Sequence, residues 1–214
     1  MKTSIALLAA AFLGVVANLH AQGTVQITFD GAPVQPPGTA ALITNYNEAG
    51  MLFTPINPGV WNEAFVRVGA DPRVERPDDG SAYLQGLLGS TLMFSFTDGS
   101  LFGLVSVDLA EYSTVVPDAV TVQFIGYYAG GGTITTSFTT DGIIDGTGPL
   151  ADFQTFTFGS GWTGLTRVEV PGYGWSLDNL VVSVPEPASG TFLLLEGLVL
   201  WQSRRPRGKV SRAA

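Results

Sequence analysis

Three carboxylates stand where they could hold a calcium ion. Asp30 follows an alternating segment near the start of the chain, Glu48 lies in the next such segment, and Asp178 lies in the last one. Calcium takes six to eight oxygen ligands, which carboxylates and loop carbonyls supply. Asp30 and Asp178 meet if the first and last strands are neighbours. The three residues therefore predict a calcium site. The alternative is that they are solvated turn carboxylates, with Asp178 bonded to the backbone.

A second candidate site consists of aromatic side chains. Trp162, Tyr173 and Trp175 lie in or near glycine-rich segments. The apolar face of such a ring can stack on the apolar face of a sugar. These residues predict a glycan-stacking surface. The alternative is that aromatic residues at strand ends pack in the core.

The composition excludes several kinds of chemistry. The chain has no cysteine, and its one histidine, His20, lies near the N-terminus, so thiolate, zinc-site and histidine-triad chemistry are not expected of residues 22–184. A carboxylate pair such as Asp108 and Glu111 could hydrolyse a glycoside without histidine, but no spacing selects one pair. We therefore predict that the protein is not an enzyme, and we keep a glycosidase as a distant alternative.

The charge is distributed unevenly along the chain. Residues 22–184 hold every acidic residue except Glu186 and Glu196, but only four of the ten basic residues. An acidic domain repels nucleic acid and anionic membrane surfaces. We expect no nucleic-acid partner.

The elements that carry these residues follow a two-residue period. Apolar residues alternate with polar ones in short segments that are separated by turn signals, and no amphipathic helix pattern of ten or more residues appears between them. Residues 46–53 are predicted as one strand, Asp98-Gly99 as a hairpin turn, and Arg167 and Glu169 as the outward residues of a strand. The pattern predicts an all-β fold, an antiparallel β-sandwich that is jelly-roll-like. Further apolar alternations are Val25, Ile27 and Phe29; Leu92, Phe94 and Phe96; Val105, Val107 and Leu109; Val120, Val122 and Phe124; Ile134 and Phe138; and Phe156 and Phe158.

The last of these segments breaks the two-residue period. Leu177 is followed by Leu180, Val182 and Val184, so the first step is three residues. All four can face the core only if Asp178-Asn179 holds an extra residue, which predicts a β-bulge.

Two glycine-rich motifs resemble phosphate-binding loops. Residues 159–164 match G-x-G-x-x-G, but the alternation that follows is that of a strand, whereas phosphate binding needs a helix there. Residues 130–132 are three glycines without a following helix or lysine. We predict turns at both places.

The two ends of the chain indicate export. Lys2 precedes an apolar stretch at residues 5–16 and a small residue, Ala21, which together predict a signal peptide with a helix over residues 1–21. At the other end, an apolar run at residues 188–201 predicts a short hydrophobic helix. At about 1.5 Å per residue the run is roughly 21 Å long, less than the ~30 Å hydrocarbon core, so we expect transient membrane insertion. The domain between the two ends is residues 22–184.

The C-terminal segment, residues 185–214, resembles the PEP-CTERM sorting signal of bacterial exported proteins. The resemblance rests on Pro185-Glu186-Pro187, the apolar run, and a basic end that includes Arg204 and Arg205. It implies recognition by an exosortase, cleavage near the motif, and release or attachment at the cell surface, often alongside exopolysaccharide production. The final Leu-Asp-Asn segment at Leu177 also resembles the last strand of jelly-roll carbohydrate-binding modules.

These observations lead to one expectation and two alternatives. We expect an exported structural or interaction protein, associated with the membrane before processing and then located at the cell surface or in the extracellular matrix. The first alternative is a calcium-stabilised module that binds an extracellular polysaccharide. The second is a carboxylate-dependent glycoside hydrolase.

Overall fold

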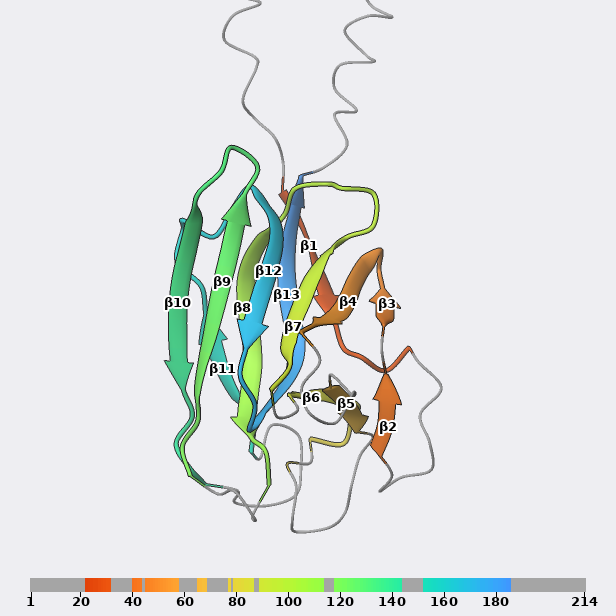
Figure 1. The fold of residues 1–214 in the computed structure, drawn as a ribbon, viewed down its shortest axis with the longest axis vertical. Helices are drawn as coiled ribbons and strands as arrows, with labels where there is room; N and C mark the ends of the chain where they lie inside the picture. The colour runs from red at the N-terminus through yellow and green to blue at the C-terminus, as the bar shows by residue number, and fades with distance from the viewer. Residues whose placement is uncertain are drawn as a thin grey trace, which may run out of the picture. The chain divides into compact units, whose positions relative to one another are not determined.

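The computed structural model describes residues 22–31, 40–43, 45–57, 65–68, 77, 79–86, 89–113, 118–143 and 152–185. Within these residues the chain forms thirteen strands and no helix. The strands make two antiparallel sheets that lie face to face (Figure 1). This arrangement confirms the all-β, jelly-roll-like antiparallel sandwich. The compact unit runs from Gly23 to Val184.

Sheet A runs in the order β11-β8-β13-β6-β5-β2, and β1 also pairs with β13. Its strands are β1 (Gln22–Ile27), β2 (Ala40–Ile43), β5 (Phe65–Val68), β6 (Tyr83–Gly86), β8 (Gly103–Glu111), β11 (Gln154–Thr157) and β13 (Trp175–Pro185). The pairing of β1 with β13 confirms that the first and last strands are neighbours.

Sheet B runs in the order β10-β9-β12-β7-β4-β3. Its strands are β3 (Tyr46–Glu48), β4 (Met51–Ile56), β7 (Thr91–Phe96), β9 (Thr121–Tyr128), β10 (Thr133–Thr139) and β12 (Leu165–Pro171).

The core lies between the two sheets, because each strand turns every second side chain inward. Phe53 and Phe94 from sheet B and Val107 and Leu177 from sheet A are fully buried in one hydrophobic cluster. Burial of this apolar surface is the main force that holds the sheets together. Other members of the cluster are Ile27, Phe29, Met51, Leu92, Leu109, Val122, Phe124, Leu165, Val168, Val170, Leu180 and Val182.

The chain crosses repeatedly between the sheets, and this corrects the prediction for Asp98-Gly99. The turn does not close a hairpin, because β7 belongs to sheet B and the next strand, β8, belongs to sheet A. Asp98 still stabilises the turn by accepting a hydrogen bond from the Ser100 N–H at 2.9 Å. The sequence signal identified the turn but not the partner strand.

Two other local predictions were wrong. Residues 46–53 form a hairpin rather than one strand, since Ala49 and Gly50 both have positive φ and reverse the chain between β3 and β4. Val105 is 38% exposed and does not share a face with Val107. The register of β8 against β13 shifts beside it, where Val181 pairs with Ser106 but Val182 pairs with Leu104.

The predicted bulge in β13 is confirmed. The register against β8 shifts between Asp178 and Val181, and Asn179 has a φ of 48°. Leu177 and Leu180 are both fully buried as a result. Asp178 follows inward-facing Leu177 and therefore points to the outer face of sheet A.

Both glycine-rich motifs are turns, as predicted. Residues 130–132 connect β9 to β10 in a hairpin, with Gly131 and Gly132 at positive φ. Residues 159–164 connect β11 to β12, and the Trp162 N–H donates to the Gly159 carbonyl at 3.1 Å. A strand, β12, follows this turn, so it offers no helix N-terminus for a phosphate.

Candidate functional site

The outer face of sheet A is covered only in part: it is buried over β6, whereas Thr155 and Thr157 of β11 and Gln26 of β1 are exposed. Tyr83 of β6 is fully buried there and packs edge-on against Phe153, with ring centroids 5.3 Å apart. The Tyr83 hydroxyl donates to the Pro77 carbonyl at 2.7 Å, and Gln85 donates to the Tyr112 carbonyl at 2.8 Å. The part of this face over β6 is therefore an interior layer and leaves little room for a large ligand.

The outer face of sheet B is open. None of the outward positions on its described strands is buried. On β9 and β10 they are mostly hydroxyl and amide side chains, and the same face continues over β12, β7 and β4. The outward residues of the first two strands are Thr121, Gln123, Ile125 and Tyr127 on β9, and Thr133, Thr135, Ser137 and Thr139 on β10.

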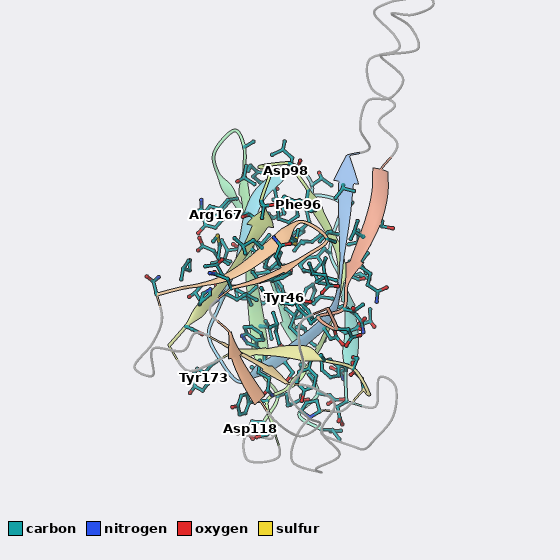
Figure 2. The ribbon with its side chains drawn as sticks, turned by 90° about the vertical axis from the view of Figure 1, so that its right-hand side faces the viewer. Tyr46, Phe96, Asp98, Asp118, Arg167 and Tyr173 are labelled. Atoms are coloured by element: carbon teal, nitrogen blue, oxygen red, sulfur yellow. The ribbon has the colours of Figure 1, made fainter. Side chains whose placement is uncertain are left out.

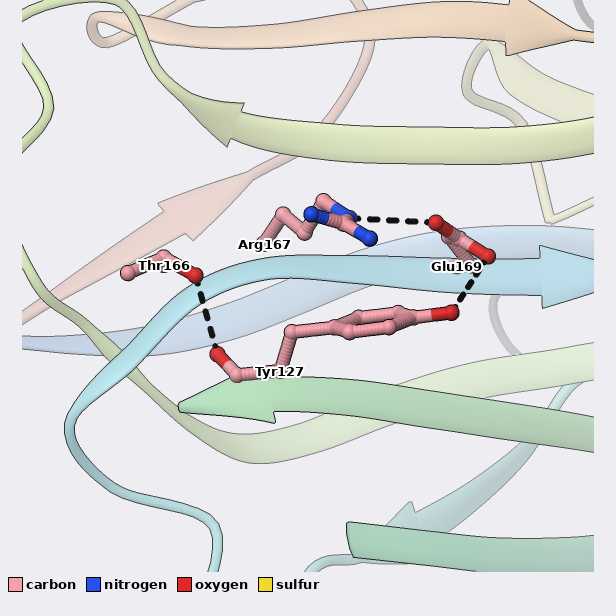
Figure 3. Close-up of polar contacts among 4 residues, drawn as sticks. All are labelled: Tyr127, Thr166, Arg167 and Glu169. Atoms are coloured by element: carbon pink, nitrogen blue, oxygen red, sulfur yellow. Dashed lines mark hydrogen bonds and ion pairs between the residues drawn. The ribbon is translucent and has the colours of Figure 1, made fainter. Parts of the chain in front are cut away.

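Three side chains on this open face form a fixed group. The Arg167 guanidinium carbon lies 3.7 Å from the centroid of the Tyr127 ring, and Arg167 Nε donates to Glu169 Oε1 at 3.1 Å. The Tyr127 hydroxyl donates to Glu169 Oε2 at 2.8 Å (Figure 3). Each carboxylate oxygen therefore has a partner, and the guanidinium is held by one hydrogen bond and one stacking contact.

The strands position this group by register. Arg167 lies opposite Tyr127 across the β12–β9 pair, and Thr133 lies opposite Tyr127 on the other side. Glu169 is two residues beyond Arg167 and hence on the same face. Thr166 donates from Oγ1 to the Tyr127 carbonyl at 3.1 Å, beside the register shift between Leu165 and Arg167.

The group can donate hydrogen bonds in a fixed direction. The Arg167 side chain is 44% exposed, and its ion pair with Glu169 uses Nε, so the Nη groups can serve a ligand. A stacked guanidinium is a planar double donor that suits paired acceptor oxygens. The hydroxyl groups of β10 can add further contacts along a flat surface. Such a surface fits an extended ligand rich in oxygen atoms.

The sequence pattern indicated part of this site. The alternation of β12 predicted that Arg167 and Glu169 point outward, which is confirmed. The sequence did not predict that Tyr127 lies beside them, because the register between β9 and β12 cannot be deduced from the sequence of either strand alone.

The three predicted calcium ligands do not come together as one group. Among the described residues no set of three acidic or histidine side chains is placed to hold a metal ion. Glu48 is occupied by its own neighbours: its carboxylate accepts hydrogen bonds from the N–H groups of Thr28 and Phe29 at 2.9 Å and from the Tyr46 hydroxyl. Glu48 therefore holds the end of β1 against β3.

Asp178 and Asp30 do approach the same segment. Asp30 accepts a hydrogen bond from the Ala82 N–H at 3.0 Å, and Asp178 accepts one from the Ser81 hydroxyl at 2.8 Å. The second acid at this place is Asp79, which the sequence analysis did not single out. It also accepts from the Ser81 hydroxyl, at 2.7 Å, and its Oδ2 is buried with no donor among the described residues as long as both carboxyl groups are ionised.

The Asp178–Asp79 pair is electrostatically unusual. Burial, together with the hydrogen bond to Asp79 and the charge of Asp79, raises the pKa of the Asp178 carboxyl to about 9. Ionising both of two neighbouring carboxyl groups that are buried away from water costs a large free energy. In neutral solution Asp178 therefore keeps its proton.

Two of the three predicted stacking residues lie inside the protein. Trp162 is 3% and Trp175 is 1% exposed, so neither ring is open to a sugar. Trp162 packs on Phe158, and Trp175 fills the space beside Gly86. The glycines beside the two rings in sequence serve turns, since Gly164, Gly172 and Gly174 all have positive φ, and the close packing of the rings is against Gly126 and Gly86 elsewhere in the chain. Only Tyr173, which is 55% exposed, lies on the surface (Figure 2).

The carboxylates weighed for glycoside hydrolysis are both buried. Asp108 accepts a hydrogen bond from Thr155 Oγ1 at 2.6 Å on the covered face of sheet A. Glu111 accepts from the Gly142 N–H at 2.7 Å and is fully buried. Neither carboxylate is open to a polysaccharide chain.

The predicted sorting segment falls almost wholly outside the described residues. Pro185 is the last residue of β13, whereas Glu186, Pro187, Arg204 and Arg205 lie beyond it, as do the predicted helices at residues 1–21 and 188–201. In the part of the chain that the structure describes, no helix is long and apolar enough to cross a membrane.

Comparisons with known proteins give weak likenesses only. No family model matches the chain, and no curated protein matches it in sequence. A family 11 carbohydrate-binding module from Clostridium thermocellum, solved with a β-1,3-1,4-mixed-linked tetrasaccharide, aligns over 77% of this chain and 97% of its own, with 11% identity and a TM-score of 0.33. The family 11 module of a cellulosomal cellulase from the same organism aligns over 77% and 96%, with 9% identity and a TM-score of 0.29.

A third solved structure is the enzymatically active domain of a tailspike protein from bacteriophage CBA120. It aligns over 76% of this chain and 19% of its own, with 9% identity and a TM-score of 0.24. Scores this low do not establish a shared function. The open face of sheet B is therefore interpreted from its own contacts.

Proposed function

We propose that this chain is an exported interaction protein of the cell surface or extracellular matrix, delivered through its C-terminal sorting segment, and that it binds its partner with the open face of sheet B. The observation that supports the binding surface is the contrast between the two sheets. Over β6 the outer face of sheet A is buried by the chain itself, whereas every outward side chain on the described strands of sheet B is at least partly exposed, and this face carries the fixed Tyr127–Arg167–Glu169 group.

The proposal for delivery rests on the sequence of the two ends. A signal peptide, the Pro185-Glu186-Pro187 motif, an apolar run and a basic end occur in the order that an exosortase substrate requires. The test is the intact mass of the protein recovered from its native envelope. Loss of residues 1–21 and of the basic end supports delivery by processing. A chain that keeps Arg204 and Arg205 and stays embedded in the membrane contradicts it.

A glycan-binding module is the second candidate, and the Tyr127–Arg167 stack favours it. The exposed Nη donors can bind paired sugar hydroxyls, and the flanking threonines extend the polar surface along β10. The acidic charge of the domain favours a neutral polysaccharide over an anionic one.

A binding experiment separates the two candidates. Pull-down on insoluble neutral polysaccharides should retain the wild-type chain, and Arg167→Ala should lose at least tenfold in affinity if the module binds glycans. Arg167→Lys keeps the positive charge but loses the planar guanidinium with its paired N–H donors, so it should also weaken binding. Asp118→Ala is the control, because this exposed residue lies away from the group and belongs to neither predicted binding surface (Figure 2). If the protein is a structural or interaction protein that does not bind glycans, none of the four proteins should bind the polysaccharides saturably.

A further inference from the structure

The free edge of β10 is the longest unprotected edge among the strands at the ends of the two sheets. β10 ends the order of sheet B, and its seven residues pair with β9 in one unbroken register. The other strands with one described neighbour are shorter: β3 has three residues, β2 and β11 have four each, and β1, which pairs with β13, has six. Among the described residues no strand pairs with the outer side of β10.

Exposed edges are usually protected against pairing by charges, prolines or bulges. The β10 sequence Thr-Ile-Thr-Thr-Ser-Phe-Thr contains no charged residue and no proline. Its neighbour β9 carries no acidic or basic residue either. The domain is acidic overall, but β9 and β10 carry no charged side chain. A second copy can therefore approach the edge of β10 with little electrostatic repulsion.

The backbone groups at this edge point outward at four positions. The Thr140 N–H donates to the Val120 carbonyl at 3.0 Å, and the Tyr128 N–H donates to the Gly132 carbonyl at 3.2 Å. Even-numbered residues of β10 thus bond toward β9. Antiparallel pairing alternates, so Thr133, Thr135, Ser137 and Thr139 direct their N–H and C=O groups away from β9.

We propose that this edge is the docking surface for a second copy of the same chain, which pairs β10 with β10 antiparallel about Thr136. In this register Thr133 faces the partner's Thr139, and Thr135 faces the partner's Ser137. All four outward residues meet outward residues, which allows about eight hydrogen bonds across the junction. The interface is isologous, as expected for a two-fold dimer.

The side chains of β10 fit this pairing as well as its backbone does. Read in either direction, the strand has the same order of hydroxyl and apolar residues about Thr136. Hydroxyl residues therefore face hydroxyl residues on the open face, and Ile134 faces the partner's Phe138 on the core side. Cross-strand pairs of these kinds are favourable. An unrelated peptide has no reason to match this symmetry, which is why a second copy is the proposed occupant.

The pairing can be tested by disulfide trapping, because the chain has no cysteine of its own. Thr136→Cys places two thiols directly opposite each other at the two-fold axis, in a non-hydrogen-bonded pair whose Cα separation of about 4.5 Å suits a disulfide. In the full chain this variant should form a covalent dimer at least tenfold faster than Ser137→Cys, which lies off the axis. Equal rates, or faster trapping at residue 137, would overturn the proposed register.

Sedimentation of the full chain provides a second measurement. The wild type should dimerise, and Thr133→Lys/Thr139→Lys should raise the dissociation constant at least tenfold, because like charges then face each other across the axis. Gln123→Lys is the matched control on the neighbouring strand and should not change it. If the double variant dimerises as tightly as the wild type, association proceeds through another surface and the proposal fails. Binding of polysaccharide by either variant is a separate readout, so failure of one proposal does not decide the other.

Discussion

The protonated pair at Asp178 predicts that Asp178→Asn will change how stability depends on pH. In the folded chain the carboxyl keeps its proton up to about pH 9, whereas in the unfolded chain it loses it near its ordinary value of 3.8. The folded state thus binds the extra proton between these values. Stability that depends on Asp178 is therefore present at low pH and falls as the pH rises through this window.

The expected size of the effect follows from the same shift. One pKa unit corresponds to about 1.4 kcal/mol, so the contribution of Asp178 falls by at most roughly 4 kcal/mol between pH 5 and pH 8. The amide introduced by Asp178→Asn does not titrate, yet it can donate as the shared proton does, and its oxygen can still accept from the Asn179 N–H. The variant should therefore gain stability relative to the wild type as the pH rises from 5 to 8.

Urea unfolding of both proteins at several pH values, with chelator present, measures this difference directly. The free energy of unfolding of Asp178→Asn minus that of the wild type should increase with pH. Asp98→Asn is the control: the pKa of exposed Asp98 is lowered by its hydrogen bonds with Ser100, so it does not titrate in this range. Two curves that stay parallel from pH 5 to pH 8 would refute a shared proton at Asp178.

Two further predictions concern the same layer and the core beneath it. The calcium prediction expects millimolar calcium to raise the melting temperature at pH 8 in the wild type but not in Asp178→Asn; an unchanged wild-type midpoint contradicts it. Gly86→Ala should destabilise the fold by about 1–3 kcal/mol, since the new Cβ would stand 2.4 Å from Cε2 of Trp175. That change corresponds to a fall of several degrees in melting temperature, whereas Gly159→Ala, which has open space around it, should leave the midpoint unchanged.

The sequence was most informative where one strand carries the whole signal. The step from Leu177 to Leu180 identified a bulge because the two-residue period is a property of that strand alone. Arg167 and Glu169 were placed on the outer face for the same reason. In contrast, Tyr127 and Arg167 meet only through the register of β9 against β12, which depends on both strands and on the turns between them.

The aromatic residues show a different limit. Trp162 and Trp175 stand among glycines, and the same pattern describes a ring held in a binding loop and a ring packed against bare backbone. For Trp175 the contact with Gly86 shows that the ring is packed against backbone, because the absence of a side chain at Gly86 leaves the space that the indole fills. That contact joins residues far apart in the chain. Likewise, only the fold brings Asp79 next to Asp178.

The pairing of β1 with β13 fixes where the chain enters and leaves the sandwich. β1 begins and β13 ends at the same end of the two sheets (Figure 1). Tyr173 and Asp118 lie toward the opposite end (Figure 2). A polypeptide held at both its N- and C-terminal segments during translocation could therefore fold without passing either terminus across the other. If the processing proposed above occurs, the two new ends of the chain lie at the same end of the sandwich (Figure 1).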